Sequence, residues 1–476
     1  MVFNLRYKVS KQLSKLLNGV MKVLPTGGKS FPGLFYIKLM GVDGISVLAK
    51  DQIDTGSILI TGTNGKTTTT KMIIGLLSKD TDISKSFDNN TINAVTTGLL
   101  NNPGDIGVFE YGIRDIQHGQ PDTVQRVIDP IGIVYTTISR EHAQVAGVKN
   151  PFDDYYEAKK LLSRNMKKGM IIANADDPFT ANIGFEKEKD VNVMYYGLDL
   201  DIDNTIGQIA NCPKCGEPLT YNKYYMYHRG DYYCSCGFKR PEPNVKINNL
   251  EFKNNKCVIN VDVNVFNYVK KTQVKFNTDI ETAILGLHNL YNTICAITAY
   301  STFTPKPENV KDNITEYFSK LDKSILPQGR FEIINYKNKL IGVGQGDNGD
   351  ALLVNSLFMR HNIGDDELHF IYTTPDEFEG EIFEDHFTVI KHLKPNLVSV
   401  LPGRVSTSIA GYYNDEIKTV LNSEEYLVEN TNERIEKIME LIDITEYDNI
   451  IITGCGDEHQ FWARLIEKIK LEKNKE

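Results

Sequence analysis

The sequence predicts an α/β protein built on two doubly wound, mainly parallel sheets. Two observations support this fold class: short apolar runs alternate with amphipathic stretches in both halves of the chain, and a glycine-rich turn joins one apolar run directly to a helix. Polar residues at the ends of the expected strands are the candidate site, because ligands of such sheets bind at the carboxyl ends of the strands. The expected strands are 58–61, 107–111, 132–136 and 170–174 in the first half, and 340–343, 368–372, 397–401 and 449–453 in the second.

Composition narrows the class of partner. The 476 residues carry a formal net charge of −9, which argues against a general nucleic-acid binder and favours small-molecule partners. No run of about 20 apolar residues occurs, so we expect no membrane span. Four of the seven cysteines cluster within 212–236, a pattern typical of metal ligation in a reducing compartment, so we expect a cytoplasmic protein.

The N-terminal segment, residues 1–50, is too short to form an independent domain. Its stretch 6–23 has a basic amphipathic face that could touch a membrane surface. We expect it to pack on the rest of the protein.

The turn after the first strand has the features of a phosphate-binding loop. In Gly62-Thr-Asn-Gly-Lys-Thr67 the two glycines let backbone N–H groups turn inward, Lys66 can reach the outer phosphates, and Thr67 can ligate Mg²⁺. The alternative is a Gly-Lys turn that opens an ordinary helix. The predicted ligand is a nucleoside triphosphate, held by residues Gly62, Thr63, Asn64, Gly65, Lys66, Thr67 and Thr68.

This loop resembles the ATP loop of the Mur ligase superfamily, which reads Gly-Thr-Asn-Gly-Lys-Thr/Ser. The resemblance implies an ATP-binding central domain of the P-loop type at 51–305 and a Rossmann-like C-terminal domain at 320–476. It also implies ATP-dependent amide-bond formation, with ATP and Mg²⁺ as cofactors. Residues 1–50 are shorter than the UDP-holding N-terminal domain of three-domain members.

Three further residues are expected to be catalytic together with Lys66. Glu110 ends a strand and suits a second Mg²⁺ ligand, or alternatively a capping or solvated acid. His142 follows the next strand and resembles the family histidine that reaches the metal, although a lone histidine is often structural. Lys159 matches the family's Ala-Lys helix, whose lysine is carbamylated; the alternative is a solvated lysine pair.

Two later motifs extend the expected nucleotide site. Asn289 and Asn292 match the family motif Gly-x-His-Asn-x-x-Asn, which implies that Asn292 contacts the base, whereas helix capping by Asn289 is the plainer reading. Arg330 matches an arginine that the family supplies to the ATP phosphates, and a guanidinium suits that role. An interdomain ion pair is the alternative for Arg330.

An insertion at 205–245 has chemistry of its own. Cys212, Cys215, Cys234 and Cys236 form two Cys-Gly knuckles about 20 residues apart, which predicts a closed, structural Zn²⁺ site. The second knuckle is Cys-x-Cys, so its geometry is slightly irregular. The insertion resembles the zinc ribbon of the MurT branch of the superfamily.

The C-terminal half contributes two loops that resemble those of peptide ligases. Asp347, Asn348 and Asp350 follow the first strand of this half, and Glu458 follows the last. The resemblance implies that they hold the incoming amino acid; an ordinary strand-end turn is the competing interpretation for each loop.

The whole mixture of motifs most resembles the archaeal pseudomurein peptide ligases. The function this implies is addition of an amino acid to a UDP-linked glutamyl peptide through an acyl phosphate. The alternative is a MurT-like synthetase that amidates lipid II glutamate with ammonia from a glutaminase subunit, although only Asp385 remains as a match for that branch's aspartate motif. A zinc-ribbon NTP switch that binds a partner is the third possibility.

Overall fold

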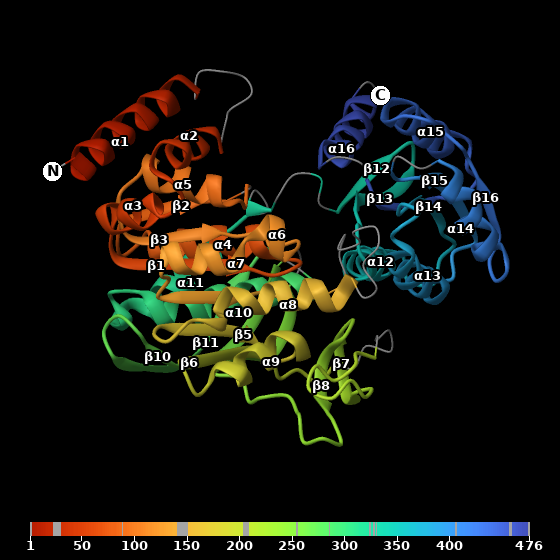
Figure 1. The fold of residues 1–476 in the computed structure, drawn as a ribbon. Coiled ribbons are helices and arrows are strands. Elements are labelled where there is room, and N and C mark those ends of the chain that lie inside the picture. The colour runs from red at the N-terminus through yellow and green to blue at the C-terminus, as the bar shows by residue number, and fades with distance from the viewer. Residues whose placement is uncertain are drawn as a thin grey trace. The chain divides into compact units, whose positions relative to one another are not determined.

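The protein consists of two compact units, Met1–Ile138 with Phe152–Ile325 and Ser139–Pro151 with Leu326–Glu476. In Figure 1 the long C-terminal stretch of the second unit is coloured from cyan to blue. The computed structural model describes residues 2–21, 30–87, 89–139, 151–202, 209–253, 256–284, 286–322, 325–326, 329, 331–404, 407–456 and 459–474.

The first unit is built on a nine-stranded sheet in the order β11-β10-β9-β6-β5-β4-β1-β3-β2. The pairings from β2 to β9 are parallel, whereas β9, β10 and β11 pair in antiparallel fashion. The central strands are buried along nearly their whole length, as expected for a sheet covered on both faces. The strands are β1 (Ile53–Thr61), β2 (Ile83–Ser86), β3 (Gly104–Glu110), β4 (Gly132–Tyr135), β5 (Met170–Asn174), β6 (Asn192–Leu198), β9 (Val245–Lys253), β10 (Lys256–Asn267) and β11 (Thr272–Thr282).

The strand order reverses at β1, which lies between β3 and β4. The connection from β1 leads through α4 toward β2 at one edge, and the connection from β3 crosses back to β4 on the other side. Such a reversal opens a crevice at the carboxyl ends of the strands, so the turn after β1 lies at the favoured ligand position. The helices of this sheet are α4 (Lys66–Leu77), α5 (Ile92–Asn101), α6 (Ile116–Gly119), α7 (Pro121–Ile128), α8 (Pro151–Arg164), α9 (Pro178–Lys187), α10 (Leu287–Phe303) and α11 (Val310–Lys320), with the short η1 (Pro307–Asn309) before α11.

Three helices precede the sheet: α1 (Val2–Met21), α2 (Phe31–Met40) and α3 (Gly44–Gln52). Figure 1 shows α1 at the outer edge of the unit, where it contacts α2 and α5 and is bonded to Asp51 of α3. Within the described part of the chain no single helix has the length and apolar character to cross a membrane; α2 and α3 pass that test only as a pair bent by 119°.

The cysteine-rich insertion forms a separate hairpin of β7 (Thr220–Met226) and β8 (Arg229–Tyr233). Tyr227 occupies the turn in a left-handed conformation, with a φ of 58°. A small cluster with Tyr232 and Phe238 packs the insertion against Ala181 of α9.

The second unit is a six-stranded sheet in the order β12-β13-β17-β14-β15-β16, in which all neighbours are parallel except β12 and β13. Trp462 and Phe461 lie in the core formed by this sheet and two of its helices. The strands are β12 (Glu332–Tyr336), β13 (Lys339–Gln345), β14 (His369–Thr374), β15 (Leu397–Pro402), β16 (Ser423–Glu425) and β17 (Asn449–Gly454). The helices are α12 (Gly349–Ile363), α13 (Gly380–Leu393), α14 (Ser408–Lys418), α15 (Thr431–Ile444) and α16 (His459–Lys473).

The predicted fold class is confirmed. Each of the eight expected strands corresponds to an observed strand, and 170–174 coincides with β5. The expectation did not include the antiparallel extension β10–β11, although β10 alternates buried and partly exposed residues, the pattern of a half-buried strand.

Candidate functional site

The turn between β1 and α4 is shaped by two glycines. Gly62 and Gly65 have φ values of 150° and 83°, which side chains rarely adopt. A Cβ at Gly62 would lie 2.0 Å from Thr136 Oγ1, and a Cβ at Gly65 would lie 2.2 Å from Asn292 Oδ1. The turn therefore requires glycine at both positions.

Lys66 folds back over this turn. Its Nζ donates to the carbonyl oxygens of Gly62 and Thr63, at 2.9 and 2.6 Å. An ammonium has three N–H groups, so one remains to donate to a phosphate oxygen. Gly65 provides no side-chain cap for α4, so the positive end of that helix also faces the turn.

Thr67 and Glu110 come together at the ends of α4 and β3. The Thr67 hydroxyl lies 3.0 and 2.9 Å from the two carboxylate oxygens of Glu110, which is only 3% exposed. A hydroxyl oxygen and a carboxylate are the donors that Mg²⁺ prefers, so this pair fits the ion that the family implies. Thr68 is buried one residue further along α4.

Lys159 reaches the same turn from α8. Its Nζ donates to the carbonyl oxygens of Gly62, at 3.0 Å, and Ile113, at 3.1 Å, and lies 4.4 Å from the centre of the Tyr155 ring. The Tyr155 hydroxyl is 2.8 Å from Thr63 Oγ1. Lys159 is 1% exposed, so the solvated lysine pair considered from the sequence does not describe it.

The end of β4 is bonded directly to the turn. Thr136 Oγ1 donates to the Asn64 carbonyl oxygen at 2.7 Å, and the Thr63 N–H donates to the Thr137 carbonyl oxygen at 2.6 Å. These bonds connect the carboxyl ends of β1 and β4, which lie on either side of the crevice.

Asp177 and the β7–β8 hairpin form hydrogen bonds to the residues that follow β4. Asp177 Oδ2 accepts from the Thr137 hydroxyl at 2.9 Å and from the Ile138 N–H at 2.6 Å. Burial opposes ionisation of Asp177, but nearby His228, with Nε2 3.5 Å from Oδ1, and these hydrogen bonds outweigh it and lower the pKa of Asp177. Arg229 Nη1 also donates to Thr137 Oγ1, at 2.9 Å.

Sequence reasoning missed His228 and Arg229. Both are 2% exposed and lie at the turn of the β7–β8 hairpin, inside what the sequence indicated to be a separate metal-binding insertion. A buried arginine over the Tyr291 ring, 5.1 Å from its centre, has no local sequence signature.

Asn289 and Asn292 lie on the first turns of α10. Asn292 Oδ1 accepts from the Thr69 hydroxyl at 3.2 Å, and its Nδ2 donates to Asn289 Oδ1 at 3.2 Å. Because Asn292 Oδ1 also occupies the space beside Gly65, it contacts the phosphate loop itself.

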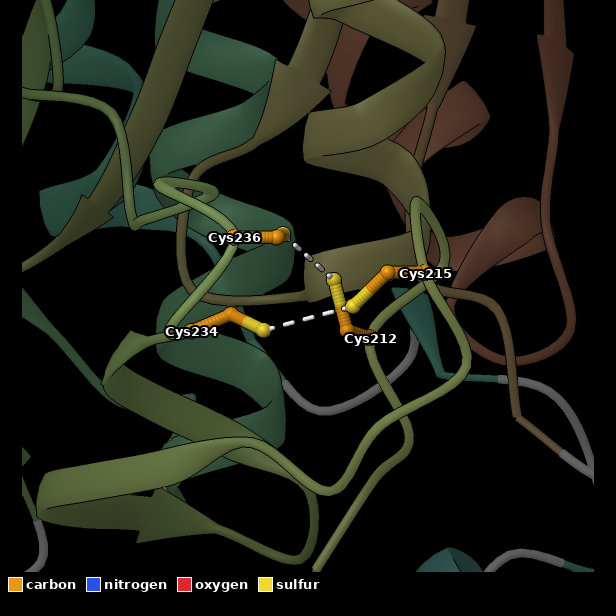
Figure 2. A group of neighbouring side chains, drawn as sticks. All are labelled: Cys212, Cys215, Cys234 and Cys236. Atoms are coloured by element: carbon orange, nitrogen blue, oxygen red, sulfur yellow. Dashed lines mark hydrogen bonds between the residues drawn. The ribbon is translucent and has the colours of Figure 1, made fainter.

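The four cysteines of the insertion converge, as Figure 2 shows. Their sulfur atoms all lie within 4.8 Å of one another, with Cys212 and Cys236 separated by 3.7 Å and Cys215 and Cys234 by 3.5 Å. Tetrahedral zinc with bonds of about 2.3 Å needs sulfurs about 3.8 Å apart, so the donor set fits Zn²⁺.

In the second unit the strand ends also meet. Asp347 follows β13, Arg404 follows β15 and Gly456 follows β17. The Asp347 carboxylate accepts from the Gly456 N–H at 3.2 Å, and Arg404 Nη1 donates to the Gly456 carbonyl oxygen at 3.3 Å. Asn348 caps α12 through the Ala351 N–H at 2.9 Å.

Arg404 is a third site residue that sequence reasoning missed. Its Nε lies 2.7 Å from Glu379 Oε2. Asp350 is buried in the first turn of α12. His142, Arg330 and Glu458 lie outside the described residues.

Comparison with known proteins gives the class that this fold and loop define. The family model of the Mur ligase middle domain matches residues 60–300, and the chain belongs to the Mur ligase family. Over 314 residues it is 25% identical to the lipid II isoglutaminyl synthase (glutamine-hydrolyzing) subunit MurT of Staphylococcus aureus (strain N315). That match spans 64% of this chain and 65% of the relative's length.

Two solved structures share the fold. The pseudomurein peptide ligase type C of Methanothermus fervidus aligns with a TM-score of 0.67 and 23% identity, over 89% of this chain and 81% of that one. The MurF ligase of Thermotoga maritima in complex with ADP aligns with a TM-score of 0.58 and 13% identity, over 91% of this chain and 84% of that one.

Proposed function

We propose that this protein is an ATP-dependent acid–amino-acid ligase that forms an amide bond and releases ADP and phosphate. The observation that carries the proposal is the convergence of Lys66, Thr67 and Glu110 on one glycine-rich turn. A cation, a hydroxyl and a buried carboxylate around a phosphate loop are the parts that bind and polarise a nucleotide triphosphate.

The proposed reaction has two steps. The acceptor carboxylate attacks the γ-phosphorus of ATP, giving an acyl phosphate and ADP; the amine then attacks the acyl carbon, loses a proton and expels phosphate. Mg²⁺, held by Thr67 and Glu110, would offset charge on the phosphates. Lys66 and the N–H groups of α4 bind the triphosphate, and Lys159 fixes the turn on which they depend.

The proposed acceptor is a UDP-linked glutamyl peptide of pseudomurein, to which the enzyme adds an amino acid in the cytoplasm. Fold similarity to the Methanothermus fervidus ligase supports this choice. The strand-end loops of the second unit supply opposite charges for an amino acid: Arg404 suits its carboxylate, and Asp347 suits its ammonium group.

The second candidate is a MurT-like synthetase that works with a glutaminase subunit. The cysteine ribbon and the sequence similarity to the Staphylococcus aureus subunit favour it. Only Asp385, a buried residue of α13, remains as a match for the aspartate motif of that branch, which counts against this candidate.

Product masses distinguish these functions. The purified chain is incubated with ATP, Mg²⁺ and UDP-linked peptides, together with single amino acids in one series and ammonia in another. Peptide ligation predicts a product heavier by one amino-acid residue and stoichiometric phosphate release. A product amidated only by ammonia would favour the second candidate, and ATP turnover without any acceptor would contradict both.

A further inference from the structure

Helix α1 exposes its apolar face. Leu5, Val9, Leu13, Leu16 and Val20 are between 45 and 69% exposed. Their spacing of four, four, three and four residues places them in one stripe along a 20-residue helix. Isolated apolar side chains are common on protein surfaces, but a continuous stripe marks an interaction surface.

The opposite face of α1 is the one that packs on the protein, and it is polar. Tyr7, Ser10, Ser14 and Asn18 are all at most 9% exposed. The Tyr7 hydroxyl donates to Asp51 at 2.6 Å, and Asn18 donates to Asn101 of α5. Serine and asparagine are thus buried while leucine and valine face outward, the reverse of an ordinary surface helix.

This orientation is fixed by specific contacts. Lys11 pairs with the same Asp51 carboxylate, and the Arg6 guanidinium donates to the Leu39 carbonyl oxygen of α2. A rotation of α1 that buried its apolar stripe would break the bonds to both α2 and α3.

Charge indicates what covers the stripe. Helix α1 contains Arg6, Lys8, Lys11 and Lys15 and no acidic residue, in a chain whose formal net charge is −9. Lys11 is paired with Asp51 of α3, whereas Lys8 is exposed. An apolar stripe flanked by cations is the pattern of a helix that lies in the headgroup region of an anionic bilayer. Two copies of α1 packed through this stripe would instead bring like charges together.

We propose that α1 docks the protein onto an anionic membrane surface, with its leucine and valine stripe among the lipid headgroups and acyl-chain ends. The helix lies along the surface and does not cross the bilayer. This inference goes beyond the proposed function and does not rest on it, because α1 contributes no residue to the phosphate loop or the other candidate sites.

Vesicle flotation of the full chain tests the proposal. We expect the protein to float with vesicles of phosphatidylcholine mixed with phosphatidylglycerol and not with phosphatidylcholine alone. The double variant Leu13→Ser/Leu16→Ser should lose flotation. Lys8→Glu, at an exposed cation, should weaken binding by at least about fivefold, since each cation near an anionic surface contributes about 1 kcal/mol.

The matched control is Val420→Ser/Leu471→Ser, which removes two apolar side chains of similar exposure from the second unit and should float as the wild type does. All variants should keep the wild-type circular dichroism and ATP-dependent activity on a soluble acceptor. Equal flotation of the Leu13/Leu16 variant and the wild type would overturn the proposal. A second outcome would also overturn it: the wild type forms a dimer and does not float, and the Leu13→Ser/Leu16→Ser variant is a monomer. A second copy of the chain would then cover the stripe.

Discussion

Lys159 Nζ donates to the carbonyl oxygen of Gly62 at 3.0 Å, which joins helix α8 to the phosphate loop across 97 residues of sequence. The same nitrogen bonds the Ile113 carbonyl oxygen, so one buried side chain fixes two strand-end segments. In the proposed function, the shape of the nucleotide site therefore depends on a residue that need not touch the nucleotide.

Replacement of Lys159 by alanine should lower both nucleotide affinity and stability. Two buried carbonyl oxygens lose a charged donor, at a cost of about 1–3 kcal/mol in the free energy of unfolding. Denaturant unfolding and ADP titration measure the two effects. The neighbouring Lys160→Ala, which removes a more exposed lysine paired with Glu186, is the control and should change neither by much.

The same variant tests the carbamylation that the family resemblance implies. If Lys159 acts as a carbamate, a short carboxylic acid added to Lys159→Ala should restore part of the ATP-dependent activity. Rescue by a short alkylamine instead would show that the ammonium is the working form.

Glu110→Gln should weaken the dependence of ATP cleavage on Mg²⁺. The amide still accepts from Thr67 but lacks the negative charge, so the Mg²⁺ concentration for half-maximal activity should rise at least about tenfold. Glu308→Gln, at an exposed acid of the same unit, should leave it unchanged. An unchanged Mg²⁺ requirement in Glu110→Gln would remove this residue from the metal site.

The ribbon should influence the nucleotide site through Arg229. Arg229→Ala removes the bond to Thr137, whose carbonyl oxygen accepts from Thr63 of the phosphate loop. Nucleotide affinity should fall roughly tenfold, the equivalent of about 1.4 kcal/mol, while the zinc content per chain should equal that of the wild type. Lys223→Ala on the outer face of β7 is the control. Unaltered affinity in Arg229→Ala would show that the ribbon is independent of the site.

His369 should make the second unit sensitive to acid. Burial lowers the pKa of His369 to about 4, and its ring nitrogens lie 2.9 Å from the Thr445 hydroxyl and 2.8 Å from the Ser399 hydroxyl. The unfolded chain binds the proton more readily than the folded one. The contribution of neutral His369 to the free energy of unfolding is therefore fully present above about pH 6.5, and about 3 kcal/mol of stability is lost as the pH falls toward 4.

Urea unfolding across this pH range measures the effect. The loss of stability between neutral and acid pH should be smaller in His369→Gln than in the wild type, whereas exposed His361→Gln should behave as the wild type does. The same pH dependence in all three proteins would contradict the assignment to His369.

The sequence is sufficient to predict site residues that lie close together in one motif. The glycines, Lys66 and Thr67 lie in one turn, and the cysteines form two short knuckles, so local spacing predicted both groups. The contacts of Arg229 with Thr137 and of Asn292 with Thr69 join segments 92 and 223 residues apart, and only the folded sheet brings them together.

Helix α1 shows a second limit of prediction from the sequence. Its amphipathic pattern is visible in the sequence, and packing on the protein was expected. Periodicity alone identifies two faces but does not decide which one packs, and here the hydrogen bonds of Tyr7, Lys11 and Asn18 favour the polar face.

The most direct test of the central claim is a single-turnover measurement of γ-phosphate release from ATP by the wild type and by Lys66→Ala. If the turn after β1 binds the triphosphate, the wild type should release phosphate only when a carboxylate acceptor and an amine are both present, and Lys66→Ala should be at least about 100-fold slower. Phosphate release by Lys66→Ala at the wild-type rate would contradict the account.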